Sequence, residues 1–395
     1  MAKNELFTYP VYAARIIYGI NWFAIAPAFI LIESQLHLSE LQIGFVATSF
    51  FVGLMPFQFI GGILASRISP RYVAMLGIFI IGIFSILTGV SETFLELFLS
   101  RMSVGIGSAM FSSPALAFLS GYSDSQTISR RTGMYNALFG IGSGIGITGW
   151  LLLDSFTGWR NSMFISGILA LAVIPFMFIL SEKLDIRNKP GEFSINFKNT
   201  IWNKYRWMLG FSAGIGALSE TVIGQMFVYY SEKTHIMSPL DSGITVSIYF
   251  IMGLFGGYAY GKYFGMSEHK TFIYVFTAII ASLLFISVPF AGNVYILTVV
   301  VWIIGALTVA VLTMLYYMVI SIDRDNRSRS FSLGFNNFMQ KIIAVVSPAL
   351  FVYIALNINY AYSWYILGIS GLILVFLYPG IYETYNRKDM TGTEF

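Results

Sequence analysis

Apolar runs long enough to cross a bilayer recur along the whole chain, and they constrain its fold more than any other feature. A membrane-spanning helix needs about 20 consecutive apolar residues, and twelve stretches approach that length. They lie near 11–32, 41–64, 72–91, 94–118, 133–154, 160–180, 207–230, 241–262, 271–290, 294–320, 331–355 and 361–382. Only 11% of the residues are charged and 56% are hydrophobic, whereas charged residues make up roughly a quarter of a soluble domain. The sequence therefore predicts an all-α integral membrane protein with twelve transmembrane helices.

The positions of lysine and arginine predict the orientation of these helices. Cytoplasmic loops of membrane proteins are enriched in both residues, and a cytoplasmic N-terminus would put 18 of the 23 basic residues on that side. Only Arg160 and Lys233 fall on the outer side. We therefore expect both termini to be cytoplasmic, in a multi-pass protein of the cell (plasma) membrane.

A polar stretch at 183–204 is the one long interruption of the apolar pattern, and it predicts a cytoplasmic linker. It separates six apolar stretches in residues 1–182 from six in residues 205–395. We expect a six-helix bundle on each side of the linker, the second one followed by a short cytoplasmic tail.

The two halves also share a sequence offset. SELQIG begins at Ser39, where the second apolar stretch opens, and SPLDSG begins at Ser238, where the eighth opens, 199 residues later. Asn136 and Asn336 lie 200 residues apart in the fifth and eleventh stretches. The common offset predicts a duplicated six-helix unit, and two repeats around a site near the membrane midplane are typical of transporters.

The loop GGILASRISPR, residues 61–71, resembles the signature loop between the second and third helices of the major facilitator superfamily. Gly62, Arg67 and Arg71 match the family pattern, whereas Ser66 stands where the family usually has aspartate. In the family this loop holds the two halves together in one conformational state. The resemblance therefore implies a conformational latch at Gly62, Arg67 and Arg71.

Two further motifs carry the same resemblance. LFLSRMSVGIGSA, residues 97–109, is similar to the family's fourth-helix pattern and has Arg101 at the position of the family's arginine. GIGSGIGITG, residues 140–149, is similar to the glycine-rich motif of the fifth helix, with Ile145 where antiporters commonly have proline. The resemblance implies two pseudo-symmetric six-helix bundles and transport by alternating access, and it favours symport over antiport.

The glycines of the fifth apolar stretch have two physical interpretations. The spacing of Gly144, Gly146 and Gly149 satisfies the dinucleotide-binding fingerprint, but no strand precedes it to form the phosphate-binding turn. In a membrane helix, small residues let neighbouring backbones approach closely. We therefore expect Gly140, Gly144 and Gly149 to pack against another helix.

Four ionisable residues fall several positions inside the apolar stretches, away from their ends: Arg15, Arg101, Glu220 and Lys341. A charge at the centre of a membrane helix costs on the order of 2.5–3.5 kcal/mol on insertion scales, and it usually faces a water-filled cavity or another charge. Three cations against one carboxylate make a positive cavity, which favours an anionic substrate.

Each of these cations shares its helix with groups that suit a binding site, either aromatic rings or carboxamides. The residues that we expect to bind substrate are Arg15, Tyr18, Trp22, Arg101, Asn336, Asn337, Gln340 and Lys341. Two alternatives stay open at this point. Arg15 lies close enough to a helix end for its long side chain to reach the surface, and Arg101 could form a structural hydrogen bond to a neighbouring helix.

Glu220 is the only carboxylate deep inside an apolar stretch, so we expect it to couple transport to protons. A nearby cation such as Lys341 or Arg101 would keep the carboxylate charged. An anionic substrate that takes over this cation would then favour proton uptake by Glu220. A fixed ion pair that stabilises the C-terminal half is the alternative.

The residues needed for enzymatic or metal chemistry are few. The sequence has no cysteine, and its three histidines lie in loops or at helix ends without the spacing of a metalloprotease. We expect no enzyme, no metal and no other cofactor. A channel is disfavoured because channels usually assemble rings of identical groups from several subunits, and a receptor would need a cytoplasmic output domain.

The sequence thus predicts a secondary transporter for a small organic anion, driven by a proton gradient in symport, with sodium as the alternative coupling ion. A proton-coupled exporter of drugs, sugars or other neutral solutes is the alternative function. We expect a monomer in the lipid bilayer that binds a small-molecule substrate and no nucleic acid.

Overall fold

The computed structural model describes residues 8–121, 125–181, 201–322 and 326–381, and all regular structure in these ranges is helical. The predicted all-α class is therefore confirmed for the described part of the chain. Both termini and most of the linker predicted at 183–204 lie outside the described residues, so their cytoplasmic side stays a prediction.

The predicted apolar stretches correspond to helices throughout these ranges. Among the described residues, ten helices are long and apolar enough to cross a membrane. The seventh predicted stretch is a helix pair, Lys204–Ser212 and Gly214–Thr234, that bends by 44° at its break, and the twelfth contains a shorter apolar helix, Tyr360–Val375. A multi-pass membrane protein is confirmed, whereas the count of twelve spans stays a prediction.

The helices group into two units, which are described separately. Unit 1 comprises residues 1–192 and 225–247, and unit 2 comprises residues 193–224 and 248–395. The segment 225–247 follows the predicted linker in the sequence, yet it packs within unit 1.

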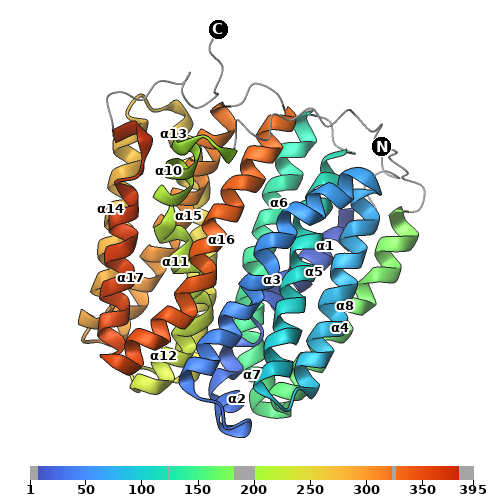
Figure 1. Ribbon diagram of the computed structural model, residues 1–395, viewed down its shortest axis with the longest axis vertical. Coiled ribbons are helices and arrows are strands. Elements are labelled where there is room, and N and C mark those ends of the chain that lie inside the picture. The colour runs from blue at the N-terminus through green and yellow to red at the C-terminus, as the bar shows by residue number, and fades with distance from the viewer. Residues whose placement is uncertain (1–7, 122–124, 182–200, 323–325, 382–395) are drawn as a thin grey trace. The chain divides into compact units, whose positions relative to one another are not determined.

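Unit 1 consists of helices that pack along their lengths. Its elements are α1 (Thr8–Phe23), η2 (Ala26–Ala28), α2 (Phe29–Gln35), α3 (Glu40–Arg67), α4 (Pro70–Val90), α5 (Phe94–Gly121), α6 (Ser125–Gly144), η3 (Ile145–Gly149), α7 (Trp150–Thr157), α8 (Trp159–Ser181), α12 (Phe227–Thr234) and the start of α13 (Pro239–Met266). In Figure 1, α3, α5, α4 and α8 lie side by side, and α1 packs against α6 and α8.

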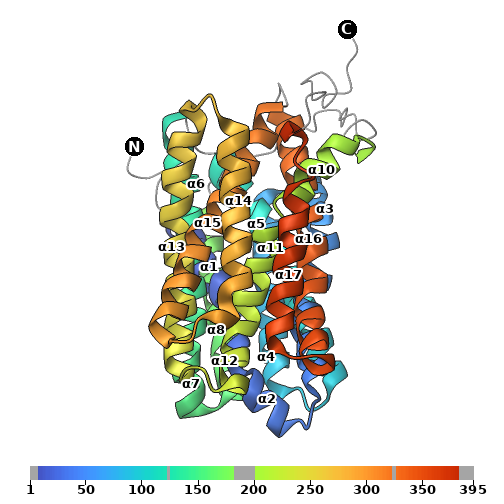
Figure 2. The same cartoon turned by 90° about the vertical axis from the view of Figure 1, so that its left-hand side faces the viewer.

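Unit 2 has α11 at its centre. Its elements are α10 (Lys204–Ser212), α11 (Gly214–Thr221), the rest of α13, α14 (Lys270–Ser287), η5 (Val288–Phe290), α15 (Val294–Ile322), α16 (Asn326–Asn357), α17 (Tyr360–Val375) and η6 (Pro379–Ile381). Figure 2 shows α14 beside α17 and α16 on the other side of α17. Helix α11 contacts all of α14, α15, α16 and α17, so a side chain on α11 is surrounded by other helices.

The repeated serines at 39 and 238 begin equivalent helices. Ser39 precedes α3, where its hydroxyl accepts a hydrogen bond from the Gln42 amide at 3.3 Å and the Gln42 side chain accepts one from the Ser39 amide at 2.8 Å. Ser238 precedes α13, and its hydroxyl accepts from the Asp241 amide at 3.1 Å. Each serine satisfies a backbone donor that the first helical turn leaves without a partner. The repeated motif therefore has a local structural cause.

Close helix packing repeats with nearly the same offset. A Cβ at Gly105 in α5 would overlap the carbonyl oxygen of Phe50 in α3, and a Cβ at Gly305 in α15 would overlap that of Tyr249 in α13. The glycines are 200 residues apart, and the carbonyl groups are 199 residues apart. Because small residues let membrane helices touch backbone to backbone, this correspondence supports the predicted duplication.

Candidate functional site

Glu220 and Lys341 form an ion pair inside unit 2. Glu220 is the second-last residue of α11, two positions before the π-helical turn η4 (Val222–Met226), and Lys341 lies midway along α16. Nζ of Lys341 is 2.9 Å from Oε2 of Glu220, and the two side chains are 11% and 19% exposed. The structure thus brings together two charges that the sequence places 121 residues apart.

Two pairs of hydroxyl groups fix the helix that carries Glu220. Thr221 and Ser347 share a hydrogen bond of 2.6 Å between α11 and α16. Ser219 and the hydroxyl of Tyr249 share one of 2.7 Å between α11 and α13. These bonds flank Glu220 on both sides in the sequence, so its carboxylate is held opposite Lys341.

Three carboxamides, Asn336, Asn337 and Gln340, precede Lys341 on α16. Asn337 accepts a hydrogen bond from the Tyr316 hydroxyl at 2.8 Å. Both amide atoms of Asn336 and Nε2 of Gln340 are buried and have no hydrogen-bond partner among the described residues. A buried polar group without a partner costs about 1–3 kcal/mol, so these amides favour the entry of a ligand or water that can bond to them.

Asn336 also borders a small cavity in unit 2. The cavity has a volume of about 10 Å³ and is lined in part by Arg206 and Ser332, whose side chains share a hydrogen bond. This volume is close to the least that holds one water molecule, about 10–15 Å³. A water there could bond to the Asn336 amide, but a substrate of several atoms needs more room than this conformation gives.

Arg101 is fully buried in unit 1, where it bonds to the end of α1. Its Nη1 and Nη2 atoms donate to the carbonyl groups of Asn21 at 3.2 Å and Trp22 at 3.4 Å. Nε2 of Gln225 donates to the Trp22 carbonyl at 3.0 Å. The last carbonyl groups of a helix lack partners within the helix, so Arg101 and Gln225 satisfy them. This geometry agrees with the structural alternative for Arg101, and its role in substrate binding stays a prediction.

Arg15 lies among aromatic rings instead of at a helix end. Its Nε atom donates to the Tyr135 carbonyl at 3.2 Å, and its guanidinium carbon is 4.6 Å from the Tyr18 ring centre and 4.1 Å from that of Tyr135. The Tyr18 ring in turn lies 5.4 Å from the ring of Trp22. Cation–π contacts of this kind stabilise a buried arginine by about 0.5–2 kcal/mol. Arg15, Tyr18 and Trp22 therefore form one group in unit 1, whereas Lys341 and its amides lie in unit 2.

The three predicted latch residues have different surroundings. Gly62 and Arg67 are exposed, and a Cβ at Gly62 would meet no atom within 4 Å. Arg71 is buried, and its Nη2 atom donates to the Phe178 carbonyl at 2.8 Å. Arg71 therefore ties α4 to α8 within unit 1, and the latch itself stays a prediction.

The glycines of the fifth stretch divide between two helix faces. A Cβ at Gly142 or Gly146 would overlap the carbonyl oxygens of Ile16 or Ile20, so these two glycines make the close approach to α1. Of the three glycines that we expected to pack against another helix, Gly140 is buried. Gly144 lies against Ser247 of α13, and the position of Gly149 meets only Ile145 of the same π-helical turn within 4 Å.

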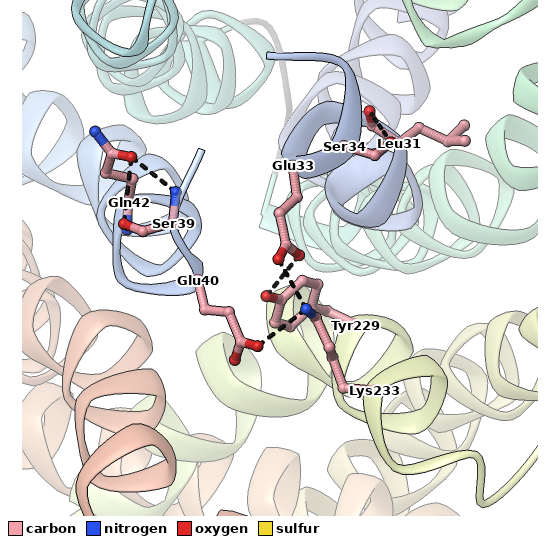
Figure 3. Close-up of polar contacts among 8 residues, drawn as sticks. All are labelled: Leu31, Glu33, Ser34, Ser39, Glu40, Gln42, Tyr229 and Lys233. Atoms are coloured by element: carbon pink, nitrogen blue, oxygen red, sulfur yellow. Dashed lines mark hydrogen bonds and ion pairs between the residues drawn. The ribbon is translucent and has the colours of Figure 1, made fainter. Parts of the chain in front are cut away.

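A second charged cluster in unit 1 was missed by the sequence analysis. Lys233 in α12 contacts Glu33 of α2 at 2.7 Å and Glu40 of α3 at 3.0 Å. The Tyr229 hydroxyl donates to Glu33 at 2.9 Å. Figure 3 shows the Lys233 ammonium group between the two carboxylates. The available signal was the placement of Lys233 on the predicted outer side, where Glu33 and Glu40 flank the first loop.

Comparison with known proteins supports the motif assignments. The family model of the Major Facilitator Superfamily matches residues 11–342. Multidrug efflux protein YfmO of Bacillus subtilis is 31% identical over 155 residues, which cover 38% of each chain. The Probable L-galactonate transporter of Escherichia coli is 22% identical over 266 residues, which cover 62% of this chain and 58% of the relative. The matched part thus spans less than two thirds of either relative.

A solved structure extends the likeness to nearly the full chain. The crystal structure of a D-xylose-proton symporter has a TM-score of 0.75 with this protein at 13% identity, covering 94% of this chain and 97% of the other. An identity this low supports a shared fold and says nothing about a shared substrate. Because the family model spans most of the chain and the fold agrees with that of a known transporter, the chain belongs to the Major Facilitator Superfamily and is a multi-pass transporter of the cell membrane, not an enzyme.

Proposed function

We propose that the protein carries a small organic anion by alternating access and couples its movement to protons in symport. The observation that carries the proposal is the Glu220–Lys341 ion pair, with 2.9 Å between Nζ and Oε2. It lies within apolar helices, and α16, which carries Lys341, also carries Asn336 and Gln340, whose buried amide atoms Nδ2, Oδ1 and Nε2 have no partner among the described residues. A preorganised cation beside vacant hydrogen-bond donors favours a carboxylate or another small anion.

The pair also supplies a coupling step. An anion that binds the Lys341 ammonium group takes the place of the Glu220 carboxylate. Without its counter-charge inside the apolar helices, Glu220 then takes a proton from water, because a buried unpaired carboxylate is strongly disfavoured. For a monovalent anion, the site is neutral when it is empty and neutral when it holds the anion and the proton. Transport is therefore electroneutral, with one proton moving per anion.

Movement between the two access states would take place by rocking of residues 1–182 against residues 205–395. The division into two six-helix bundles is supported by the serine caps and glycine contacts that recur after about 200 residues. In this proposal the exposed residues Gly62 and Arg67 belong to the latch. Arg71 positions the loop from its contact with Phe178.

One relative is named for a substrate that agrees with this proposal, and others are named for substrates that agree with its alternative. The Escherichia coli relative is named for L-galactonate, the anion of a sugar acid, which agrees with an anion site. The Bacillus subtilis relative is named for multidrug efflux, and the solved structure for D-xylose and protons. A proton-coupled exporter of drugs or neutral solutes is therefore the second candidate. The rings around Arg15, including Tyr18, Tyr135 and Phe139, favour it, because they suit flat apolar ligands.

Uptake into proteoliposomes under an imposed pH gradient tests the proposal. The panel would contain carboxylates, sugar acids, neutral sugars and cationic drugs, each with and without a membrane potential or a sodium gradient. We expect an anion to accumulate with the pH gradient, to be unaffected by the membrane potential if it is monovalent, and to need no sodium. Accumulation or expulsion of neutral or cationic compounds alone would favour the second candidate, and dependence on sodium would replace the proton as the coupling ion.

A further inference from the structure

A second buried carboxyl group lies in unit 1, far along the chain from Glu220. Asp154 belongs to α7, and only 4% of its surface is exposed. Neither of its carboxyl oxygens makes a hydrogen bond of normal geometry among the described residues, and the Ser162 hydroxyl is the polar group recorded beside them. Such a group is unusual, because buried charges in proteins are normally paired or hydrogen-bonded.

The surroundings of Asp154 are held tightly. The chain passes from α7 to α8 through Gly158, whose φ of 78° lies in the left-handed region that glycine adopts most easily. The Gly158 amide donates to the Asp154 carbonyl at 2.9 Å, and the Trp150 indole donates to the Ser162 carbonyl at 3.1 Å. The α7–α8 junction is thus a compact turn that encloses the carboxyl group.

The elements packed against α7 place no cation beside Asp154. Neither η2 nor η3 contains an ionisable residue, and Arg160 is the only one in α8. Arg160 donates instead to the carbonyl groups of Gly89 at 3.0 Å and Ser91 at 2.7 Å. Helix α13 approaches α7 through Gly243, and its nearby charged residue, Asp241, is exposed and bonded to Ser238. The described groups around Asp154 therefore leave its charge without compensation.

We propose that Asp154 is a second proton-binding site of this transporter, protonated in the conformation described here and ionised when water reaches the α7–α8 junction. Ser162, whose side chain lies beside the carboxyl group, donates its own hydroxyl hydrogen to the Gly158 carbonyl at 3.2 Å. The Ser162 oxygen consequently keeps a lone pair that suits a protonated carboxyl group. This inference does not depend on the substrate or on the Glu220–Lys341 site.

Helix α2 contacts the α7–α8 junction of unit 1 through its last residue. Trp159, the first residue of α8, donates from its indole nitrogen to the Gln35 side chain at 2.8 Å. Gln35 is the last residue of α2, and α7 packs against η2, which directly precedes α2. A displacement of α2 would therefore uncover the junction and let Asp154 release its proton.

Infrared difference spectroscopy of the purified full-length protein tests the proposal directly. A protonated carboxyl group has a C=O stretching band that is separate from the carboxylate bands. We expect wild type at neutral pH to show such a band that is absent from Asp154→Asn and retained in Glu220→Gln. Asp241→Asn is the matched control, since it removes an exposed carboxylate and should leave the band unchanged. Identical protonated-carboxyl bands in wild type and Asp154→Asn would overturn the proposal, whatever the result for Glu220→Gln.

The pH dependence of unfolding gives a second, independent readout. A carboxyl group that is protonated when folded and ionised when unfolded stabilises the protein at low pH, and this stability is lost as pH rises. From about pH 5 upwards, the equilibrium constant for unfolding should rise with pH more steeply in wild type than in Asp154→Asn, by about a factor of ten per pH unit. This difference in slope ends at the pH where Asp154 ionises in the folded state. Parallel curves would contradict the proposal. If Asp154→Asn does not fold, Asp154→Glu must shift the infrared band, and an unshifted band would likewise overturn it.

Discussion

The two lysine clusters of this protein differ in where they lie on their helices. Lys233 is in the last turn of α12, between two carboxylates, and its side chain is 24% exposed. Lys341 is midway along α16, opposite Glu220, and its side chain is 11% exposed. Lys233 is the more exposed of the two lysines, although Glu33 and Glu220 are similarly exposed, at 18% and 19%. Ion pairs open to solvent contribute about 0–1 kcal/mol to stability, whereas removing one partner of a fully buried pair costs about 3–5 kcal/mol.

The difference indicates which cluster a substrate can use. At Lys233, an incoming anion would have to compete with both Glu33 and Glu40, and the cluster already carries more negative than positive charge. At Lys341, one anion can replace Glu220, and nearby amides offer additional donors. The Lys233 cluster therefore suits a structural contact between helix ends, and the Lys341 pair suits an exchangeable binding site.

The largest expected effect is that of Glu220→Gln. A glutamine keeps the size and hydrogen-bonding groups of the side chain but cannot take up and release a proton. We expect proton-driven accumulation in proteoliposomes to be abolished, while exchange of substrate between the two sides continues. Glu33→Gln is the matched control in the other cluster and should accumulate substrate as wild type does. Unchanged uphill uptake by Glu220→Gln would remove this residue from the mechanism.

Replacement of Lys341 by alanine should weaken anion binding at least about tenfold, on the order of 1.4 kcal/mol, because the cation that attracts the substrate is lost. Titration calorimetry with the transported anion would measure the dissociation constant. Lys233→Ala should bind with the affinity of wild type. If both variants bind equally well, the anion site lies elsewhere in the protein.

A smaller effect is expected for Asn336→Leu. The Asn336 amide has no partner among the described residues, so its removal should not destabilise the empty protein. The loss of one hydrogen bond to the anion, about 0.5–1.5 kcal/mol, should weaken binding by about two- to twelvefold. Thermal unfolding and the dissociation constant would be measured together. A drop in stability without a change in affinity would show that Asn336 has a structural role.

The smallest effect is expected for Lys233→Met, which keeps much of the length of the side chain and removes its charge. The unfolding free energy should fall by about 1 kcal/mol or less, with no change in anion affinity. Chemical denaturation and binding measurements on the same preparation would check both values. A large loss of affinity would show that the Lys233 cluster takes part in substrate binding and would remove the distinction between the two clusters.

Local patterns in the sequence predicted much of the fold. Apolar length identified the helices, and the motifs at Ser39 and Ser238 marked helix starts because an N-terminal cap depends on neighbouring residues alone. The cost of an intramembrane charge singled out Glu220 and Lys341 as candidates. Their contact joins α11 to α16 and depends on how distant helices pack, so the sequence could offer it only as one of two possible pairings.

The features that the sequence missed depend on helix rotation and chain path. Gly140 and Gly144, like Gly142 and Gly146, are spaced four residues apart and therefore form equally good small-residue faces. The sequence does not say which face meets α1, and the π-helical turn at 145–149 changes the phase of the helix beyond it. The Lys233 cluster needed the finding that residues 225–247 pack with unit 1.

The most direct test of the exchangeable Lys341 site is ligand-induced thermal stabilisation of the purified protein. Wild type, Lys341→Ala and Lys233→Met would be screened against carboxylates, inorganic anions, sugars, amino acids and cationic drugs. A ligand at 100 times its dissociation constant stabilises the folded state by about 2.7 kcal/mol. We predict that an anion stabilises wild type and Lys233→Met equally and stabilises Lys341→Ala by about half as much or less. Stabilisation by neutral or cationic compounds alone, equal in all three proteins, would contradict the account.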